Sequence, residues 1–270
     1  MSRHFAVFGH PVAHSLSPKI HAAFGKQTGI AIDYRAIDVE PGHFTHALND
    51  FVAQGGAGAN VTLPFKQAAF SLCDDLTERA RRAGAVNTLV RNGDTWHGDN
   101  TDGVGLVRDL TDRHALDLRA RRTLLLGAGG AARGVLGPLL EADPEYLEIA
   151  NRNAERAAEL AREYSTLGTV HGCGFDGIAE STFDLVLNAT SASLQDTIPP
   201  IPPSVIAPTT LCYDMAYGKG DTAFTRWCKS AGAGRTETGW GMLVEQAAES
   251  FLLWRGVKPE TAPVIAAVKR

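Results

Sequence analysis

The stretch TLLLGAGGAARGVLGPLL, which starts at Thr123, constrains the fold more than any other part of the chain. Its apolar run predicts a strand over 123–127, and the residues after the glycines have helical spacing. Gly127, Gly129 and Ala132 match the G-x-G-x-x-A pattern at this turn from strand to helix. Glycines let the backbone approach a pyrophosphate, and a helix N-terminus offers N–H donors. The pattern predicts a dinucleotide-binding domain; the alternative is a glycine-rich turn that binds nothing.

The end of the next predicted strand, YLEIAN at 146–151, indicates which dinucleotide is bound. An NAD-binding domain usually carries Asp or Glu about 20 residues after the glycines, where it binds the ribose hydroxyls. Here the strand is followed by Arg152, and Arg156 lies one helical turn further. Their forked donors match the oxygens of a 2′-phosphate, which points to NADP. The alternative is a solvated basic helix start, since Arg and Glu alternate in this run.

Predicted strands alternate with helical patterns along the chain, which favours a parallel α/β architecture. The predicted strands are FAVFG (5–9), IDYRAIDV (32–39), GANVTL (58–63), TLLLG (123–127), YLEIAN (146–151), FDLVLNAT (183–190) and TLCYDMAY (210–217). Residues 99–112 have apolar side chains at helical spacing and predict a crossover helix between two domains. The amphipathic stretch from Met242 predicts a C-terminal helix that returns to the first domain.

The composition excludes several classes of protein. The chain has 270 residues and a formal net charge of -4, so no basic surface favours nucleic acid or an anionic membrane. No uninterrupted apolar run approaches the roughly 20 residues of a membrane span. The four cysteines never form a CxxC pair, and the paired histidines lack acidic company, so we expect reduced thiols and no metal. A cytoplasmic protein is expected, whether monomer or homodimer.

The motif NVTLPFK at 60–66 places polar side chains where an apolar strand ends. Lys66 follows Pro64, so its ammonium group can reach into a cleft instead of joining a sheet. Asp102 lies at the start of the predicted crossover helix. A lysine and an aspartate brought together in a partly dry cleft can share and move a proton. The alternatives are a surface lysine and a helix N-cap aspartate.

A series of motifs along the chain resembles shikimate dehydrogenase in order and spacing. The motifs are HSLSP at 14–18, NVTLPFK at 60–66, GAVNT at 84–88, DNTDGVG at 99–105, GAGGAAR at 127–133, NR at 151–152, NATS at 188–191, YDMAY at 213–217 and GMLVEQAAESF at 241–251. They cover nearly the whole chain. The resemblance implies an N-terminal α/β substrate domain, residues 1–105 plus 240–270. It also implies a Rossmann-like NADP-binding domain with a parallel sheet, residues 106–239, with catalysis in the cleft between the two.

The resemblance also implies the reaction, which is the reversible NADPH-dependent reduction of 3-dehydroshikimate to shikimate in aromatic amino-acid biosynthesis. Lys66 and Asp102 correspond to the catalytic pair of the family. In the reductive direction the lysine, oriented by the aspartate, would protonate or stabilise the developing alkoxide. The residues implied to bind the substrate are Ser15, Ser17, Asn60, Thr62, Asn87, Tyr217 and Gln246, of which Ser15, Ser17 and Tyr217 would hold its carboxylate.

The cofactor residues implied by the resemblance fall into three groups. The group around the phosphates contains Gly127, Ala128, Gly129, Gly130 and Ala131, the group around the 2′-phosphate contains Asn151, Arg152, Asn153 and Arg156, and the group around the nicotinamide contains Ala189, Met215, Gly239 and Met242. The chain departs from the family pattern in two places. Asn153 stands where a threonine is common, and Ala192 and Ser193 stand where a glycine usually follows NATS.

Two other functions remain open from the sequence. A quinate/shikimate dehydrogenase would accept another substrate hydroxyl and would often use NAD, but the missing acid after YLEIAN argues against it. A noncatalytic NADPH-binding sensor would keep the fold without the chemistry. It would need neither Lys66 nor Asp102, so their presence favours the enzyme.

Overall fold

The chain divides into two compact units, each with its own six-stranded sheet and hydrophobic core. The computed structural model describes residues 4–218 and 220–268, so the predicted outer ends of the first domain, 1–3 and 269–270, lie outside the described residues. Unit 1 contains the residues up to Gly105 and those from Val244 onward, and unit 2 runs from Leu106 to Leu243. Both divisions fall inside helices, α5 (Asp102–Arg108) and α9 (Trp240–Arg255).

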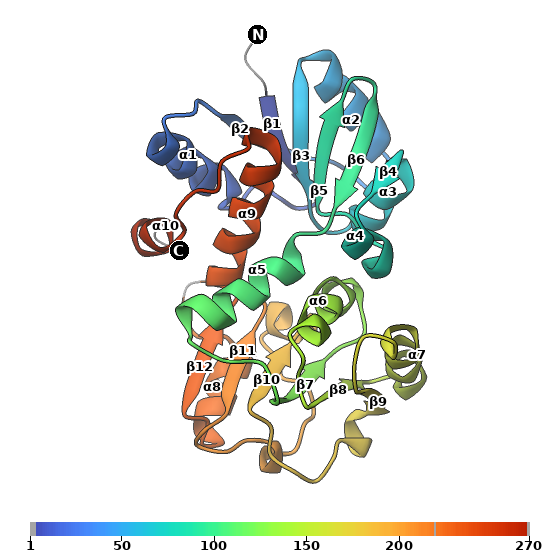
Figure 1. Cartoon of the computed structure of the whole chain (residues 1–270), viewed down its shortest axis with the longest axis vertical. Helices are drawn as coiled ribbons and strands as arrows, with labels where there is room; N and C mark the ends of the chain where they lie inside the picture. The colour runs from blue at the N-terminus through green and yellow to red at the C-terminus, as the bar shows by residue number, and fades with distance from the viewer. Residues whose placement is uncertain (1–3, 219, 269–270) are drawn as a thin grey trace. The chain divides into compact units, whose positions relative to one another are not determined.

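Unit 2 has a sheet whose six strands are all parallel (Figure 1). The strands are β7 (Arg122–Leu126), β8 (Tyr146–Asn151), β9 (Val170–Gly174), β10 (Leu185–Asn188), β11 (Leu211–Asp214) and β12 (Arg235–Thr238), in the order β12-β11-β10-β7-β8-β9. The first strand, β7, has β8 on one side and β10 on the other. The strand order therefore reverses between β7 and β10, which is the switch point of a doubly wound fold. The predicted Rossmann-like domain with a parallel sheet is confirmed.

Helices cover both faces of this sheet because side chains alternate along its strands. Leu125 and Leu187 face a core shared with α6 (Gly130–Glu141) and α7 (Ala154–Tyr164). Leu124 and Val186 face the opposite core, which includes residues of α8 (Ala223–Ser230). The helical segments η1 (Asp109–Arg113), η2 (Phe175–Gly177), η3 (Ala192–Gln195) and η4 (Pro203–Val205) are short.

Unit 1 has a mixed sheet, which the sequence analysis did not predict. Its strands are β1 (His4–Gly9), β2 (Asp33–Asp38), β3 (Gly56–Val61), β4 (Asp75–Leu76), β5 (Thr88–Asn92) and β6 (Thr95–Asp99), in the order β2-β1-β3-β5-β6-β4. β5 runs antiparallel to both β3 and β6. The hairpin turns at Gly93, whose φ of 59° is a conformation that glycine adopts without strain. The two-residue loop Gly93-Asp94, between the paired residues Asn92 and Thr95, is a hairpin signal that the sequence analysis missed.

Helices also cover the sheet of unit 1, and β1 shows how the faces are divided. The helices of this unit are α1 (Ser17–Thr28), α2 (Phe44–Ala53), α3 (Lys66–Leu72), α4 (Glu78–Ala83), α9 and α10 (Ala262–Ala267), of which α10 packs on α1. Phe8 packs edge-on against Phe44 of α2, with ring centroids 5.8 Å apart. Phe5, on the other face, packs on Trp254 of α9 at 4.8 Å. The indole Nε1 of Trp254 donates to the carbonyl of Leu89, so α9 is fixed to the sheet.

Several strands end earlier than the sequence predicted. β3 ends at Val61, β10 at Asn188 and β11 at Asp214, whereas the patterns extended to residues 63, 190 and 217. The polar or small residues that follow lie in the loops at the carboxyl ends of the strands. The predicted site residues among them, Thr62, Ala189, Met215 and Tyr217, are therefore loop residues. In doubly wound sheets, ligands bind at this edge.

His21 of α1 gives unit 1 an acid-sensitive core. The side chain is fully buried and stacks on Tyr34 with ring centroids 4.2 Å apart. Burial lowers the pKa of His21 from 6.5 to about 3. In the unfolded chain the imidazole takes up a proton near its ordinary pKa, while in the folded chain it stays neutral. Stability is therefore retained above pH 6.5 and is lost as the pH falls toward 3.

We expect His21→Phe to flatten the acid dependence of the free energy of unfolding. The variant keeps an aromatic ring but loses the titration, which contributes on the order of 4 kcal/mol of pH dependence. Urea unfolding at a series of pH values measures the slope between pH 6.5 and 3. The control is His43→Phe, at an exposed position. Equal slopes for wild type and His21→Phe would contradict the prediction.

Candidate functional site

The structure of unit 1 brings Lys66 and Asp102 into direct contact. Lys66 is the first residue of α3 and Asp102 the first residue of α5. The ammonium Nζ of Lys66 lies 2.5 Å from Oδ2 of Asp102. The two side chains are 22% and 11% exposed, so the ion pair is mostly but not fully shielded from water. A partly exposed ammonium group held on one side by a carboxylate still has N–H donors for a ligand.

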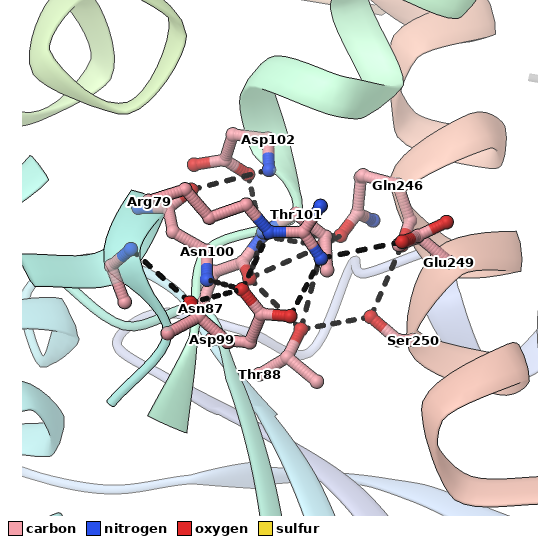
Figure 2. A network of polar contacts seen from close by, with 12 residues as sticks. Arg79, Asn87, Thr88, Asp99, Asn100, Thr101, Asp102, Gln246, Glu249 and Ser250 are labelled. Atoms are coloured by element: carbon pink, nitrogen blue, oxygen red, sulfur yellow. Dashed lines mark hydrogen bonds and ion pairs between the residues drawn. The ribbon is translucent and has the colours of Figure 1, made fainter. Parts of the chain in front are cut away.

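Asn87 fixes the orientation of the Asp102 carboxylate (Figure 2). Its Nδ2 donates to Oδ1 of Asp102 at 2.7 Å, which leaves Oδ2 for Lys66. The carbonyl Oδ1 of Asn87 in turn accepts from the backbone nitrogen of Thr101 at 2.9 Å. The amide of Asn87 is thus held at both ends. The carboxylate is held in a single orientation relative to the lysine.

Gln246 of α9 joins the same network. Its Oε1 accepts from Nδ2 of Asn87 at 3.4 Å and from the hydroxyl of Thr101 at 3.3 Å. α5 and α9 approach closely here, because a methyl group on Gly105 would lie 2.7 Å from the backbone nitrogen of Gln246. Only glycine allows this approach. The predicted residues Asn87, Asp102 and Gln246 are therefore neighbours.

Asn60 is buried beneath this network, with 6% of its surface exposed. Its Nδ2 lies within hydrogen-bond distance of the carbonyl of Asn87 and the hydroxyls of Thr88 and Ser250. Its Oδ1 accepts from the hydroxyl of Tyr34 at 2.8 Å. An amide has two N–H donors, and both have acceptors within the protein.

A part-buried ion pair that the sequence analysis missed, between Arg79 and the buried Asp99, supports the segment before Asp102. Arg79 donates from Nε and from a terminal nitrogen to the two carboxylate oxygens of Asp99, both at 2.6 Å, and also reaches Glu249 of α9 (Figure 2). Burial alone would raise the pKa of Asp99, but the guanidinium group of Arg79 outweighs it and keeps the pKa below its ordinary value. The sequence ERARR around Arg79 reads as a solvated helix surface, so nothing in its pattern marks this arginine.

The remaining predicted substrate residues lie in loops or at helix starts. Ser17 is the buried first residue of α1. The backbone nitrogen of Ser17 donates to the hydroxyl of Ser15 at 3.3 Å. Thr62 follows β3 in the turn that leads to Lys66. Tyr217 belongs to unit 2, where it follows β11 and is 40% exposed.

The glycine loop of unit 2 fits a pyrophosphate. Gly127 follows β7 with a φ of 108°, a conformation that favours glycine. A Cβ on Gly129 or Gly130 would meet no atom within 4 Å, so the backbone is open where a phosphate would approach. Ala128 and Ala131 belong to the same loop and helix start. The first turn of α6 contains no acidic residue, so its N–H donors and dipole can attract an anion.

The residues after β8 suit a 2′-phosphate. Asn151 ends β8, and the side chain of Asn153 caps α7 by accepting from the backbone nitrogen of Arg156 at 3.1 Å. Arg152 and Arg156 are exposed, and neither guanidinium group forms an ion pair within the described residues. By contrast, Arg133 of α6 is already bound to Glu163. Two unpaired arginines and no acid at this strand end favour a phosphate over a ribose diol.

The residues implied to surround the nicotinamide lie together within unit 2. A methyl group on Gly127 would lie 3.2 Å from the carbonyl oxygen of Ala189, so the loop after β10 runs beside the glycine loop. A methyl group on Gly239 would overlap the carbonyl of Met215. The backbone nitrogen of Met242 donates to the hydroxyl of Tyr213, which itself donates to the buried Asp109. The loops after β10 and β11 and the start of α9 are therefore in contact.

Across residues 4–218 and 220–268, no cluster of three His, Cys, Asp or Glu side chains is placed to hold a metal ion. No helix in these ranges is long and apolar enough to cross a membrane. All four cysteines are free thiols.

Family comparisons cover most of the chain. Residues 7–89 match the shikimate dehydrogenase substrate binding domain, residues 109–195 match shikimate / quinate 5-dehydrogenase, and residues 239–269 match the shikimate 5'-dehydrogenase C-terminal domain. A protein of Stenotrophomonas maltophilia named shikimate dehydrogenase (NADP(+)) is 54% identical over 266 residues, which are 98% of this chain and 95% of the relative.

Solved structures share the fold over the full length. The Ael1 enzyme from Pseudomonas putida superposes with a TM-score of 0.93 at 42% identity and covers 100% of this chain and 99% of its own. Shikimate 5-dehydrogenase from Thermus thermophilus, solved in complex with NADP(H) and shikimate, has a TM-score of 0.87 at 34% identity. That match covers 99% of this chain and 98% of the other.

We expect Arg79→Gln to destabilise unit 1 strongly. The carboxylate of Asp99 would stay buried without its cation, which costs about 3 kcal/mol for a broken buried pair. The control is Arg81→Gln in the same helix, because Arg81 and Asp75 form an exposed pair that contributes less than about 1 kcal/mol. The shift in urea midpoint measures both. Equal shifts in the two variants would show that the Arg79–Asp99 pair stabilises the fold no more than the exposed Arg81–Asp75 pair.

Proposed function

The chain belongs to the shikimate dehydrogenase family of NADP-dependent oxidoreductases, and we propose that Lys66 and Asp102 carry the proton transfer of its reaction. The reaction is the reversible reduction of the ketone of 3-dehydroshikimate to the secondary alcohol of shikimate, in the pathway to the aromatic amino acids. The observation that carries the proposal is the 2.5 Å contact between the two side chains, with the carboxylate oriented by Asn87.

Reduction of the ketone to the alcohol requires that one proton be delivered to the carbonyl oxygen. NADPH, when bound, supplies a hydride to the carbonyl carbon of the substrate. Negative charge then develops on the carbonyl oxygen, and the ammonium group of Lys66 donates a hydrogen bond and then a proton to it. In the oxidative direction the amine of Lys66 takes the proton of the hydroxyl group. Asp102 keeps its charge beside the lysine and holds Nζ in place.

Two further groups of side chains bind the substrate in this proposal. Gln246 lies beside Asn87, and Thr62 lies in the turn before Lys66, so these two polar side chains suit the ring hydroxyls. Asn87 already donates to Asp102 and Gln246 and accepts from Thr101, so its role here is to orient Asp102. Within unit 1, the hydroxyls implied to hold the substrate carboxylate are those of Ser15 and Ser17. Neutral donors suffice for a carboxylate when several of them act together.

The resemblance implied that Asn60 binds the substrate, but this proposal gives Asn60 a supporting role. Both of its N–H donors have acceptors within unit 1, and its oxygen accepts from Tyr34. Its contact with the carbonyl of Asn87 makes it a support for the residue that orients Asp102. We assign it a positioning role rather than direct contact with the substrate.

The cofactor of the family is NADP, and we assign its binding in this chain to the carboxyl edge of the parallel sheet. Gly129 and Gly130, where the backbone is open, would hold the pyrophosphate. Arg152 and Arg156 would hold the 2′-phosphate, with the NH₂ of Asn153 as a further donor. The absence of an acid at the end of β8 supports NADP over NAD.

The proposal also bears on the oligomeric state and the cellular location of the protein. All proposed site residues belong to one chain, so the proposal fits a monomer and a homodimer equally. We infer a cytoplasmic protein, which suits its four free thiols and its biosynthetic reaction.

We expect Lys66→Met to lower kcat by about 10²- to 10⁴-fold, because it removes the group that moves the proton. The dissociation constant for NADPH should stay unchanged, since Lys66 lies in the other unit from the glycine loop. Lys66→Arg should also fail, because a guanidinium group keeps the charge but does not give up a proton. The control is Lys26→Met at an exposed site of α1. Full turnover in Lys66→Met would remove this lysine from the mechanism.

We expect Arg152→Ala to raise the KM for NADP at least about tenfold, from the loss of charged hydrogen bonds to the 2′-phosphate. The KM for NAD, which lacks that phosphate, should not change. Initial rates with both cofactors measure the ratio. Arg162→Ala, at an exposed position near the end of the same helix, serves as the control. An equal rise for NADP and NAD would place Arg152 away from the phosphate.

A further inference from the structure

Unit 2 contains a buried carboxylate that the proposed mechanism does not use. Asp214 ends β11 and is fully buried. Its four hydrogen-bond donors are neutral: Nδ2 of Asn188 and the backbone nitrogen of Ala216 bind one oxygen, while the hydroxyls of Ser193 and Thr222 bind the other. Burial raises the pKa of Asp214 although these hydrogen bonds lower it. The carboxylate therefore depends on its hydrogen bonds for stabilisation.

The donors tie together the two loops that follow β10 and β11. Ser193 lies in η3, in the loop after β10, and its hydroxyl is 2.5 Å from Oδ2 of Asp214. Thr222, the N-cap of α8, reaches the same oxygen from the far end of the loop after β11. Asn188 contacts both Ser193 and Asp214 at 3.2 Å. Asp214 is thus the common anchor of both loops.

These loops lie on one defined side of the phosphate-binding strand. In the sheet order, β8 with Arg152 lies on one side of β7, and β10 and β11 lie on the other. A dinucleotide whose pyrophosphate lies at Gly129 and whose 2′-phosphate lies at Arg152 must extend its other half toward β10 and β11. The carbonyl of Ala189 beside Gly127 marks the start of that path. This placement rests on the proposed function.

We propose that Ser193 is a positioning residue that, through its hydrogen bond to Asp214, holds the loop after β10 in the shape that receives the nicotinamide half of NADP. The hydroxyl of Ser193 gives this loop a fixed contact to a buried anion. Without the hydroxyl of Ser193, Oδ2 of Asp214 loses one of its two hydrogen-bond donors, and the loop is no longer held to the carboxylate.

The test separates the two halves of the cofactor. The ligand 2′,5′-ADP contains the adenosine and its 2′-phosphate but no nicotinamide, so it reports on Arg152 and the fold of unit 2 alone. Calorimetric titration gives the dissociation constants of NADPH and 2′,5′-ADP for wild type, Ser193→Ala and Ser193→Thr. Ser193→Thr keeps a hydroxyl and serves as the rescue. Ser191→Ala, an exposed serine in the same loop, is the matched control.

We expect Ser193→Ala to weaken NADPH binding about tenfold, the size of one hydrogen bond to a charged group, with 2′,5′-ADP unchanged. Ser193→Thr and Ser191→Ala should bind both ligands as wild type does. Unchanged NADPH binding in Ser193→Ala, or equal loss of both ligands, would overturn the inference. A wild-type chain that bound neither ligand would overturn the proposed cofactor site itself and the inference with it.

Discussion

The carboxylate of Asp102 is the group on which the proposed chemistry depends, because each of its oxygens has a different partner. One oxygen accepts from Asn87 and the other binds Lys66. A carboxylate that could rotate would let the lysine move away from the substrate oxygen, and even small displacements slow a proton transfer. The fold prevents this through Thr101, Gln246 and Asn60, which hold Asn87 from three sides.

The two units meet different physical demands. Unit 1 holds a charged pair that is partly shielded from water, supported by a layer of neutral amides and hydroxyls and by the part-buried Arg79. Unit 2 offers backbone donors at the end of a parallel strand and needs open space there, which Gly129 and Gly130 provide. The buried carboxylate of Asp214 joins its loops after β10 and β11.

The sequence predicted those features that depend on local pattern. The glycine turn after β7, the helix at α5 and the site motifs around Lys66 and Asp102 all have short-range signals. The antiparallel β5 was missed because an alternation of strands and helices is typical of parallel sheets, and the Gly93-Asp94 turn was overlooked. β9 and β12 were missed because VHGCG and RTET contain glycine or polar residues. The Arg79–Asp99 pair and the Asp214 anchor join residues far apart in the chain, so no periodicity reveals them.

The most direct test is the initial rate of NADP reduction with shikimate, measured beside quinate and beside NAD on one purified sample. Two arginines free for a 2′-phosphate predict a strong preference for NADP, and the family assignment predicts a preference for shikimate. Comparable rates with quinate or NAD would contradict this assignment and indicate a broader quinate/shikimate dehydrogenase. Binding of NADPH without any turnover would contradict the catalytic role of Lys66 and Asp102.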